Sequence, residues 1–384
     1  MHVLVAPDKF KGSLTAVQVA GHVAAGLQAA APDVGVDQLP VADGGDGTVE
    51  AAVSAGYRRV PVRALGPTGE MVETSYAERD GVAVVELADV SGLRRLPDGT
   101  LSPLTASSYG TGQVIRAALD AGACRIVLGV GGSASTDGGA GLVEALGARL
   151  LDEAGAPVPR GGAGLARLHR LDLTGLHPAL RSVEVVVACD VDNPLSGPHG
   201  AAAVYGPQKG ASPEDVAALE TALRHWARVV TQATGRDCAD VAGAGAAGGV
   251  AFGALAILGA TVRTGIDLVL DLIGFADRLQ GAALVVTGEG TLDAQTLRGK
   301  APAGVAAAAE AAGIPVVAVA GRCLLEPAEL QAVGIRRAYS LVDLEPNLAR
   351  SMTEAGSLLE QLAARIAADW LPTPTTTHLG QERP

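Results

Sequence analysis

The sequence predicts an α/β protein with two domains, and three observations carry that prediction. The 384 residues are two to three times the length of a typical domain. Hydrophobic residues make up 48% of the chain and aromatic residues only 3%, beside 51 glycines, which indicates a core of Ala, Val and Leu with many tight turns. Short apolar runs alternate with Gly- and Asp-rich turns and Ala-rich helical stretches, as in βα units.

The first βα unit sets the pattern for the rest of the chain. A strand is expected at residues 3–6, a turn at 7–12, and a helix that stops near Pro32. The helix has apolar side chains at Val17, Ala20, Val23, Ala24 and Leu27, which share one face. Further strands are expected at residues 36–42, 126–130, 183–188, 283–286 and 316–320. Several of these runs are apolar throughout, which is typical of parallel strands covered on both faces.

The pattern changes between about residues 60 and 90. Strands are expected at 57–63, 70–77 and 82–87 without helices between them, and the turns at 66–69 and 79–81 indicate antiparallel hairpins. Because the parallel pattern resumes after about residue 280, we expect one discontinuous parallel-sheet domain with a second α/β domain inserted in it. The expected bounds are 1–59 with 280–370 for the first domain, 60–279 for the insert, and 371–384 for a disordered Pro- and Thr-rich tail.

Charge and cysteine usage narrow the classes of partner. A formal net charge of −12 argues against binding to nucleic acid or to an anionic membrane surface, because both require a positive face. The uncharged stretch 241–262 is mostly Gly and Ala, so it is interpreted as a buried segment of a soluble protein. The chain starts with a strand rather than a signal-peptide pattern, and its four cysteines form no C-x-x-C pair. We therefore expect a cytoplasmic protein with reduced thiols.

Lysine is rare in this chain and its placement is informative. Of the 29 basic residues only Lys9, Lys11, Lys209 and Lys300 are lysines, and each lies near a glycine in an expected loop. A compact ammonium group beside backbone that allows close approach suits phosphate binding. The alternative is that four lysines are too few to judge.

Two loops near the N-terminus carry candidate ligand groups. Asp8, Lys9 and Lys11 follow the first strand, where the start of the expected helix would also favour an anion, unless the lysines are simply solvated. The loop at 43–48 carries Asp43 and Asp46 between glycines, so its carboxylates could bind a metal ion or a hydroxyl group. A turn with an N-capping aspartate is the competing interpretation.

The glycine-rich loop at 129–139 admits two interpretations. Gly129, Gly131 and Ala134 satisfy G-x-G-x-x-A after a strand, with acidic residues about 20 positions on, which mimics a dinucleotide-binding fingerprint. We discount that interpretation, because residues 137–139, Asp-Gly-Gly, would break the helix that should begin there. Such a loop suits phosphate or polyol binding equally well.

Two later loops place carboxylates beside strand ends. Asp190 comes directly after the strand at 183–188, where it could act as a general base or a Mg²⁺ ligand, or be an ordinary turn residue. Residues 287–302 contain Glu289, Asp293 and Lys300. This last loop is not a P-loop, because no glycine lies five residues before Gly299 and alanine follows Lys300.

Together these loops resemble the bacterial glycerate kinase family, the two-domain α/β class without a P-loop. The similar segments are 6–14, 40–48, 129–141, 189–195, 197–210, 243–249 and 287–302, so the resemblance spans nearly the whole chain. It implies a flavodoxin-like domain with a second α/β domain. It also implies ATP- and Mg²⁺-dependent phosphorylation of D-glycerate, with 2-phosphoglycerate the favoured product.

We assign roles on this basis. Asp190 is the favoured catalytic base, with Asp293 in reserve and Lys300 as a catalytic cation. The expected contacts to phosphate or substrate are Asp8, Lys9, Lys11, Gly44, Gly45, Gly131, Gly132, Ser133, Asp137, Asn193 and Lys209. The Mg²⁺ candidates are Asp43, Asp46 and Glu289. A monomer or homodimer acting on a small molecule is expected. A nucleotide-dependent oxidoreductase using residues 129–134 and a non-catalytic metabolite sensor are the alternatives.

Overall fold

The computed structural model describes residues 1–371, which form two compact units. Unit 1 joins Met1–Val41 to the segment that begins at Gly274, and unit 2 is Ala42–Ile273. The division therefore falls earlier than the boundary expected after residue 59. It does so because Val49, Ala52 and Tyr57 are buried in a hydrophobic cluster of unit 2. Beyond Leu371, the expected tail lies outside the described residues.

Unit 1 is built on a five-stranded sheet in the order β2-β1-β11-β12-β13, with all strands parallel. Its strands are β1 (His2–Pro7), β2 (Gly35–Gln38), β11 (Ala282–Leu292), β12 (Val316–Cys323) and β13 (Ile335–Ser340). Numbered along the unit, this order is 2-1-3-4-5, the flavodoxin-like arrangement. The fold expected for this part of the chain is confirmed.

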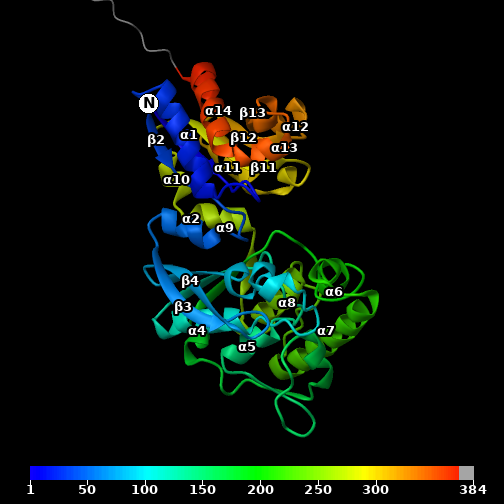
Figure 1. The fold of residues 1–384 in the computed structure, drawn as a ribbon. Coiled ribbons are helices and arrows are strands. Elements are labelled where there is room, and N and C mark those ends of the chain that lie inside the picture. Colours follow the sequence, from blue (N-terminus) through cyan, green and yellow to red (C-terminus); the bar gives the residue numbers. More distant parts are fainter. Residues whose placement is uncertain (372–384) are drawn as a thin grey trace, which may run out of the picture. The chain divides into compact units, whose positions relative to one another are not determined.

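Helices supply the apolar layers of unit 1. They are α1 (Ala16–Ala30), α10 (Phe275–Arg278), α11 (Ala301–Ala311), α12 (Pro327–Ala332), α13 (Leu348–Thr353) and α14 (Ala355–Trp370). α1 and α14 lie side by side (Figure 1) and bury Val23 and Leu359 against strand residues such as Val5. The fit is tight, because a Cβ on Gly26 of α1 would lie 2.3 Å from the Glu360 carbonyl oxygen of α14.

Unit 2 contains a six-stranded mixed sheet in the order β10-β9-β6-β5-β4-β3. Its strands are β3 (Arg58–Leu65), β4 (Met71–Arg79), β5 (Val82–Glu86), β6 (Arg125–Gly129), β9 (Glu184–Ala188) and β10 (Thr261–Arg263). β10, β9, β6 and β5 are parallel, whereas β5, β4 and β3 pair antiparallel. The two expected hairpins are confirmed. A separate antiparallel pair joins β7 (Arg149–Leu151) to β8 (Arg170–Asp172).

The helices of unit 2 pack around this sheet. They are α2 (Thr48–Ser54), α3 (Ala88–Ser91), α4 (Tyr109–Asp120), α5 (Ala140–Ala145), α6 (Ala201–Tyr205), α7 (Pro213–Thr234), α8 (Ala246–Gly253) and α9 (Gly265–Leu272). Trp226 of α7 is fully buried and donates its indole N–H to the Gly138 carbonyl, 2.9 Å away. This bond ties the longest helix of the unit to the glycine-rich loop after β6. None of the described helices, in either unit, is long and apolar enough to cross a membrane.

Two local expectations were wrong. α1 begins at Ala16, because Thr15 and Gln18 form a capping box, so Lys9 and Lys11 lie in a turn before the helix rather than at its start. β11 continues to Leu292, so the first part of the presumed loop 287–302 is strand. Only Lys300, the N-cap of α11, is a lysine at a helix N-terminus.

Candidate active site

A pocket of about 220 Å³ in unit 2 gathers many of the expected site residues. It is lined by residues of the loops that follow β6 and β9, by the loop 43–45, and by the segments 205–209 and 246–248. Loops that follow neighbouring parallel strands emerge at one edge of a sheet, which is where ligands bind in α/β folds. The candidate residues that line it are Asp43, Gly44, Gly45, Gly131, Gly132, Ser133, Asp190 and Lys209.

Glycine lets the backbones around this pocket approach each other closely. Gly44 has a φ of +83°, and a Cβ on it would lie 2.6 Å from the Cα of Gly265. A Cβ on Gly131 would lie 2.8 Å from the Cα of Gly45. A side chain at Gly44 would push the loop of Asp43 away from Gly265 and Ala188, and one at Gly131 would push it away from the loop after β6, so both glycines are required for the pocket's shape.

Asp190 is held at the first turn of a helix. Its Oδ1 accepts a hydrogen bond from the Gly265 N–H, the first residue of α9, at 2.7 Å. Desolvation by the surrounding protein raises the pKa of Asp190 to about 6, although the Gly265 bond opposes the shift, and the charge of Asp43 adds to it. The side chain is still exposed at the pocket. A carboxylate with this pKa suits proton abstraction near neutral pH.

Lys209 is the cation of the pocket. It lies in a short 3₁₀ turn (Pro207–Lys209) and is 2% exposed. Its ammonium group donates to the Ser133 hydroxyl at 2.8 Å and to the Ser135 carbonyl oxygen at 2.5 Å. Desolvation lowers the pKa of Lys209 to about 7, with the charge of Asp137 opposing that shift. The lysine expected in this loop is thus a buried one, and Gly248 makes room for it, since a Cβ there would lie 2.9 Å from Nζ.

Two other candidates lie behind the pocket rather than in its wall. Asp137 is fully buried, and its Oδ2 accepts hydrogen bonds from the Ser108 N–H at 2.8 Å and the Ser108 hydroxyl at 2.9 Å. Asn193 accepts a bond from the Tyr205 hydroxyl at 2.6 Å, and Tyr205 lines the pocket. Both residues anchor loops in this structure, so their expected contact with substrate would be indirect.

Asp46 forms part of a charged cluster that the sequence did not predict. Its carboxylate forms an ion pair with Arg94, whose Nη2 also lies 3.1 Å from Oε1 of the buried Glu86. Burial and the charge of Asp46 raise the pKa of Glu86 to about 7, while Arg94 lowers it. A glutamate that ends the apolar strand β5 was the signal available in the sequence for this cluster.

The remaining candidates lie in unit 1, around the neighbouring ends of β1 and β11. The Asp8 N–H donates to the Gly288 carbonyl of β11 at 2.8 Å, so the residues that follow β1 lie beside β11, where the strand order reverses, the usual ligand position in this fold. Lys9 Nζ lies 3.7 Å from Asp8, and Lys300 Nζ lies 3.9 Å from Glu289. Glu289 also accepts a hydrogen bond from the Thr296 hydroxyl group at 2.5 Å.

The last two candidates of unit 1 lie beside β11, because the backbone N of Lys11 would lie 3.3 Å from a Cβ on Gly290, and the Asp293 N–H donates to the Thr296 hydroxyl at 3.0 Å. Lys11 is exposed, and Asp293 accepts the Gln295 N–H within a turn. No three His, Cys, Asp or Glu side chains among residues 1–371 cluster as a metal site.

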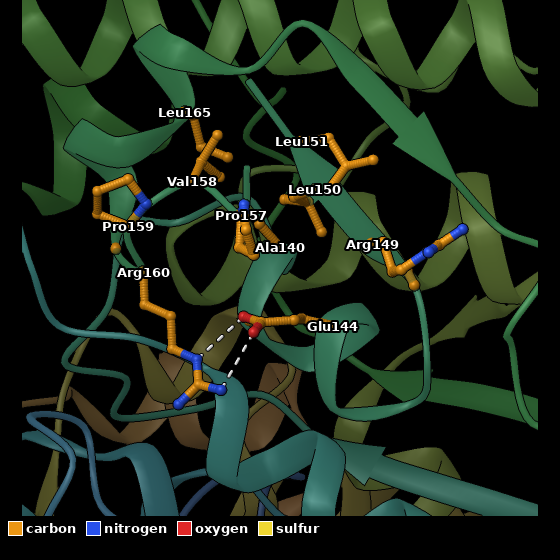
Figure 2. A pocket seen from close by; sticks show the side chains of 13 residues that line it. Ala140, Glu144, Arg149, Leu150, Leu151, Pro157, Val158, Pro159, Arg160 and Leu165 are labelled. Atoms are coloured by element: carbon orange, nitrogen blue, oxygen red, sulfur yellow. Dashed lines mark hydrogen bonds and ion pairs between the residues drawn. The ribbon is translucent and has the colours of Figure 1, made fainter. Parts of the chain in front are cut away.

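A second pocket of unit 2, of about 120 Å³, lies beside α5 and β7 (Figure 2). Its walls are mainly apolar, with Leu150, Val158 and Pro159 among them. The guanidinium of Arg160 makes two bonds to Glu144, at 3.0 and 3.1 Å, and lies 3.4 Å from the ring centre of Tyr109. None of the expected site residues lines this pocket, so it is not the candidate active site.

The fold and the site together define an α/β protein in which a carboxylate of raised pKa, a buried lysine and glycine-rich loops surround one pocket, a set of groups that suits a small anionic substrate. The family model of the glycerate kinase family matches residues 3–371. The chain belongs to this family, and the resemblance inferred from its loops is confirmed.

Individual relatives match over most of their length. A glycerate kinase of Halalkalibacterium halodurans is 44% identical over 369 residues, which is 95% of this chain and 97% of that protein. A glycerate 2-kinase of Escherichia coli is 42% identical over 346 residues, 89% of this chain and 91% of the relative. The crystal structure of a protein provisionally named glycerate kinase 2 from Salmonella typhimurium LT2 has a TM-score of 0.83 at 42% identity, over 96% of this chain and 99% of that one.

Proposed function

We propose that this protein transfers the γ-phosphoryl group of ATP to D-glycerate and releases ADP and a phosphoglycerate, with 2-phosphoglycerate favoured. Membership of the glycerate kinase family supports the activity, and the name of the Escherichia coli relative supports the position of the phosphate. The observation that carries the mechanism is Asp190, a carboxylate with a raised pKa at the wall of a pocket that also contains a buried lysine.

In the proposed reaction Asp190 accepts the proton of the substrate hydroxyl group. The hydroxyl oxygen then forms a bond to the γ-phosphorus, and the bond from that phosphorus to the β–γ bridging oxygen breaks, so the electron pair leaves with ADP. The Gly265 N–H keeps the Asp190 carboxylate oriented, since it occupies one oxygen and leaves the other for the substrate. General base catalysis of this kind contributes about 10²- to 10⁴-fold to a rate.

Anion binding is assigned separately within each unit. In unit 2 we propose that Lys209 and the backbone N–H groups of Gly131 and Gly132 bind an anionic group of a ligand. In unit 1 we propose that Lys9, Lys11 and Lys300 bind phosphate oxygens, with Asp8 keeping Lys9 in place.

Mg²⁺ is proposed as the metal of the reaction, and its role would be to neutralise charge on the phosphates. Carboxylate oxygens are the donors that Mg²⁺ prefers, and Asp43 presents one at the pocket wall, so the residues fit the ion. Asp46 and Glu289 are weaker candidates, because Arg94 and Lys300 already lie beside them. Asp43 is therefore the favoured ligand.

Release of ADP tests the proposed activity directly. The purified protein is expected to release ADP from ATP when D-glycerate and Mg²⁺ are both present, and to stop when EDTA removes the metal. The assay compares ADP formed with D-glycerate, with L-glycerate and with no acceptor. Unchanged turnover in EDTA would exclude the metal role, and NAD(P)H absorbance in place of ADP would favour an oxidoreductase.

The pH dependence of the reaction tests the base. Because the pKa of Asp190 is raised to about 6, its carboxylate is protonated below that pH and cannot accept the substrate proton. We expect kcat/KM to fall about tenfold for each pH unit below about 6, and to fall again above about pH 7, where Lys209, whose pKa is lowered to about 7, loses the proton of its ammonium group. Steady-state rates from pH 4.5 to 8 in buffers of constant ionic strength give the profile. Activity that is constant down to pH 5 would contradict the assignment.

We also propose a cytoplasmic protein that is active as a monomer or homodimer. Its four cysteines, Cys124, Cys189, Cys238 and Cys323, are all free thiols, which suits a reducing compartment.

A further inference from the structure

Arg94 connects two loops of the unit 2 pocket. It lies in the short 3₁₀ turn Leu93–Arg95, and the N–H of Leu93 donates to the Gly132 carbonyl at 3.0 Å. The Arg94 guanidinium is half-exposed and forms ion pairs with Asp46, with Glu86 at 3.1 Å and with Asp89 at 3.4 Å. One short turn therefore contacts both the glycine-rich loop after β6 and the loop that begins at Asp43.

Glu86 completes this connection from the end of β5. It is 4% exposed, and its Oε2 accepts hydrogen bonds from the Gly47 N–H at 3.0 Å and the Val49 N–H at 3.4 Å. Its other oxygen, Oε1, binds Arg94. The buried carboxylate thus joins the arginine to the backbone at the start of α2.

The loop 43–47, which Arg94 and Glu86 hold, has a high conformational entropy cost of ordering. Residues 43–47 include three glycines, and Gly44 and Gly47 have φ values of +83° and +99°. Glycine loses more conformational freedom on folding than any other residue, so such a loop depends on its anchors. The charged anchors are Arg94 and Glu86, while Asp43, Gly44 and Gly45 face the pocket.

We propose that Arg94 is a positioning residue for phosphoryl transfer, which holds Asp46 and Glu86 together and thereby fixes the loop of Asp43, Gly44 and Gly45 at the pocket. The expected effect of Arg94 on the rate rests on the proposed function, whereas its expected effect on the loop does not. Arginine suits the role because its planar fork can bind several carboxylates at once, whereas the ammonium of lysine is a single point charge.

The neighbouring Arg95 offers a matched control. It bonds to the Asp89 carbonyl at 2.6 Å and to the Asp89 carboxylate at 2.7 Å. Arg95 therefore holds the same turn through Asp89, whereas Arg94 also forms ion pairs with Asp46 and Glu86. Removal of either arginine deletes one positive charge from this cluster, so a difference between the two variants reports on the loop rather than on net charge.

Hydrogen exchange of the ligand-free protein gives the first test. In Arg94→Ala the backbone amides of residues 43–49 are expected to exchange about tenfold faster or more, since the loop loses the ion pair that joins Asp46 to Arg94 and, through Arg94, to Glu86. In Arg95→Ala the same amides should exchange as in the wild type. Equal exchange of this segment in Arg94→Ala and the wild type would overturn the proposal.

Kinetics give the second test. With ATP, Mg²⁺ and D-glycerate, Arg94→Ala is expected to lower kcat by about tenfold or more, with a smaller change in KM, because a displaced loop impairs orientation more than binding. Arg94→Lys should retain part of the activity, and added methylguanidinium should partly restore Arg94→Ala. If Arg94→Ala does not fold, the exchange and kinetic tests apply to Arg94→Lys, and wild-type values in that variant would overturn the proposal. If exchange is faster in Arg94→Ala but the wild type shows no kinase activity, the proposed reaction is rejected, while the role of Arg94 in holding the loop is retained.

Discussion

Replacement of Asp190 with asparagine is expected to lower kcat by about 10²-fold or more, with little effect on stability. Asparagine has nearly the same shape, and its carbonyl oxygen can still accept the Gly265 N–H that now binds Asp190 at 2.7 Å. The variant therefore retains the contact that orients the side chain. It loses only the ability to accept a proton, which is the property that the mechanism requires.

The neighbouring Asp192 provides the control for this experiment. It is exposed in the same loop, two residues further on. Asp192→Asn removes the same charge and should leave kcat within about twofold of the wild type. The measurement is steady-state ADP release for both variants, with thermal unfolding to establish that both are folded. If kcat of Asp190→Asn is unchanged and only KM rises, Asp190 binds the substrate, and Asp293 becomes the candidate base.

Strand-end reasoning led from the sequence to loops whose residues Asp43, Gly131 and Asp190 line one pocket of unit 2, although the roles of these residues stay predictions. Gly131 and Asp190 follow the neighbouring parallel strands β6 and β9, and loops after such strands gather at one edge of an α/β sheet. Asp43 follows β2, which pairs with β1 in the sheet of unit 1, so this reasoning does not explain its place in the pocket. The glycines at 138 and 139 also act as expected, because the helix that follows β6 does not begin until Ala140.

The ion-pair and hydrogen-bond partners of the charged side chains could not be predicted in the same way. Asp46 looked like an open carboxylate, but its ion-pair partner Arg94 lies 48 positions along the chain. Glu86 and the Gly47 N–H are likewise brought together only by the packing of α2 on the sheet. Side-chain pairs of this kind depend on the fold, and a single sequence contains no pattern that indicates them.

Strands at a sheet edge were also hard to predict. β13 contains Arg336 and Arg337, which are exposed, so it lacks the continuous apolar run of the central strands. It lies at the edge of the parallel sheet of unit 1, where one side of the strand has no partner. Charged residues are favoured on such strands because they discourage pairing with other chains.

Lys209→Met is expected to lower kcat/KM by about tenfold or more while the protein stays folded. Methionine is similar in length to lysine and fits an apolar interior, but it removes the only lysine that lines the pocket. Desolvation of a buried ammonium is costly, as the lowered pKa of Lys209 indicates. The variant avoids that cost but leaves the Ser135 carbonyl without its donor, a loss of about 1–3 kcal/mol, so the two changes in stability oppose each other.

Ser133→Ala separates the two ways in which Lys209 could act. It removes the hydroxyl that accepts the Lys209 bond but keeps the ammonium group in the pocket. If the charge acts on the ligand, Ser133→Ala should reduce kcat/KM much less than Lys209→Met. Equal losses in the two variants would show that Lys209 acts only by holding the loop.

The pH dependence of unfolding gives a test of Lys209 that does not require activity. In the folded protein the pKa of Lys209 is about 7, whereas in the unfolded chain the pKa returns to its ordinary value of 10.5. The unfolded state therefore binds more protons between these values, and this group makes the folded state more stable as pH rises through that window. We expect the free energy of unfolding of the wild type, relative to that of Lys209→Met, to increase from pH 7 to pH 9. Denaturant unfolding of both proteins at each pH measures that difference, and a constant value would show that the ammonium is not desolvated in the folded protein.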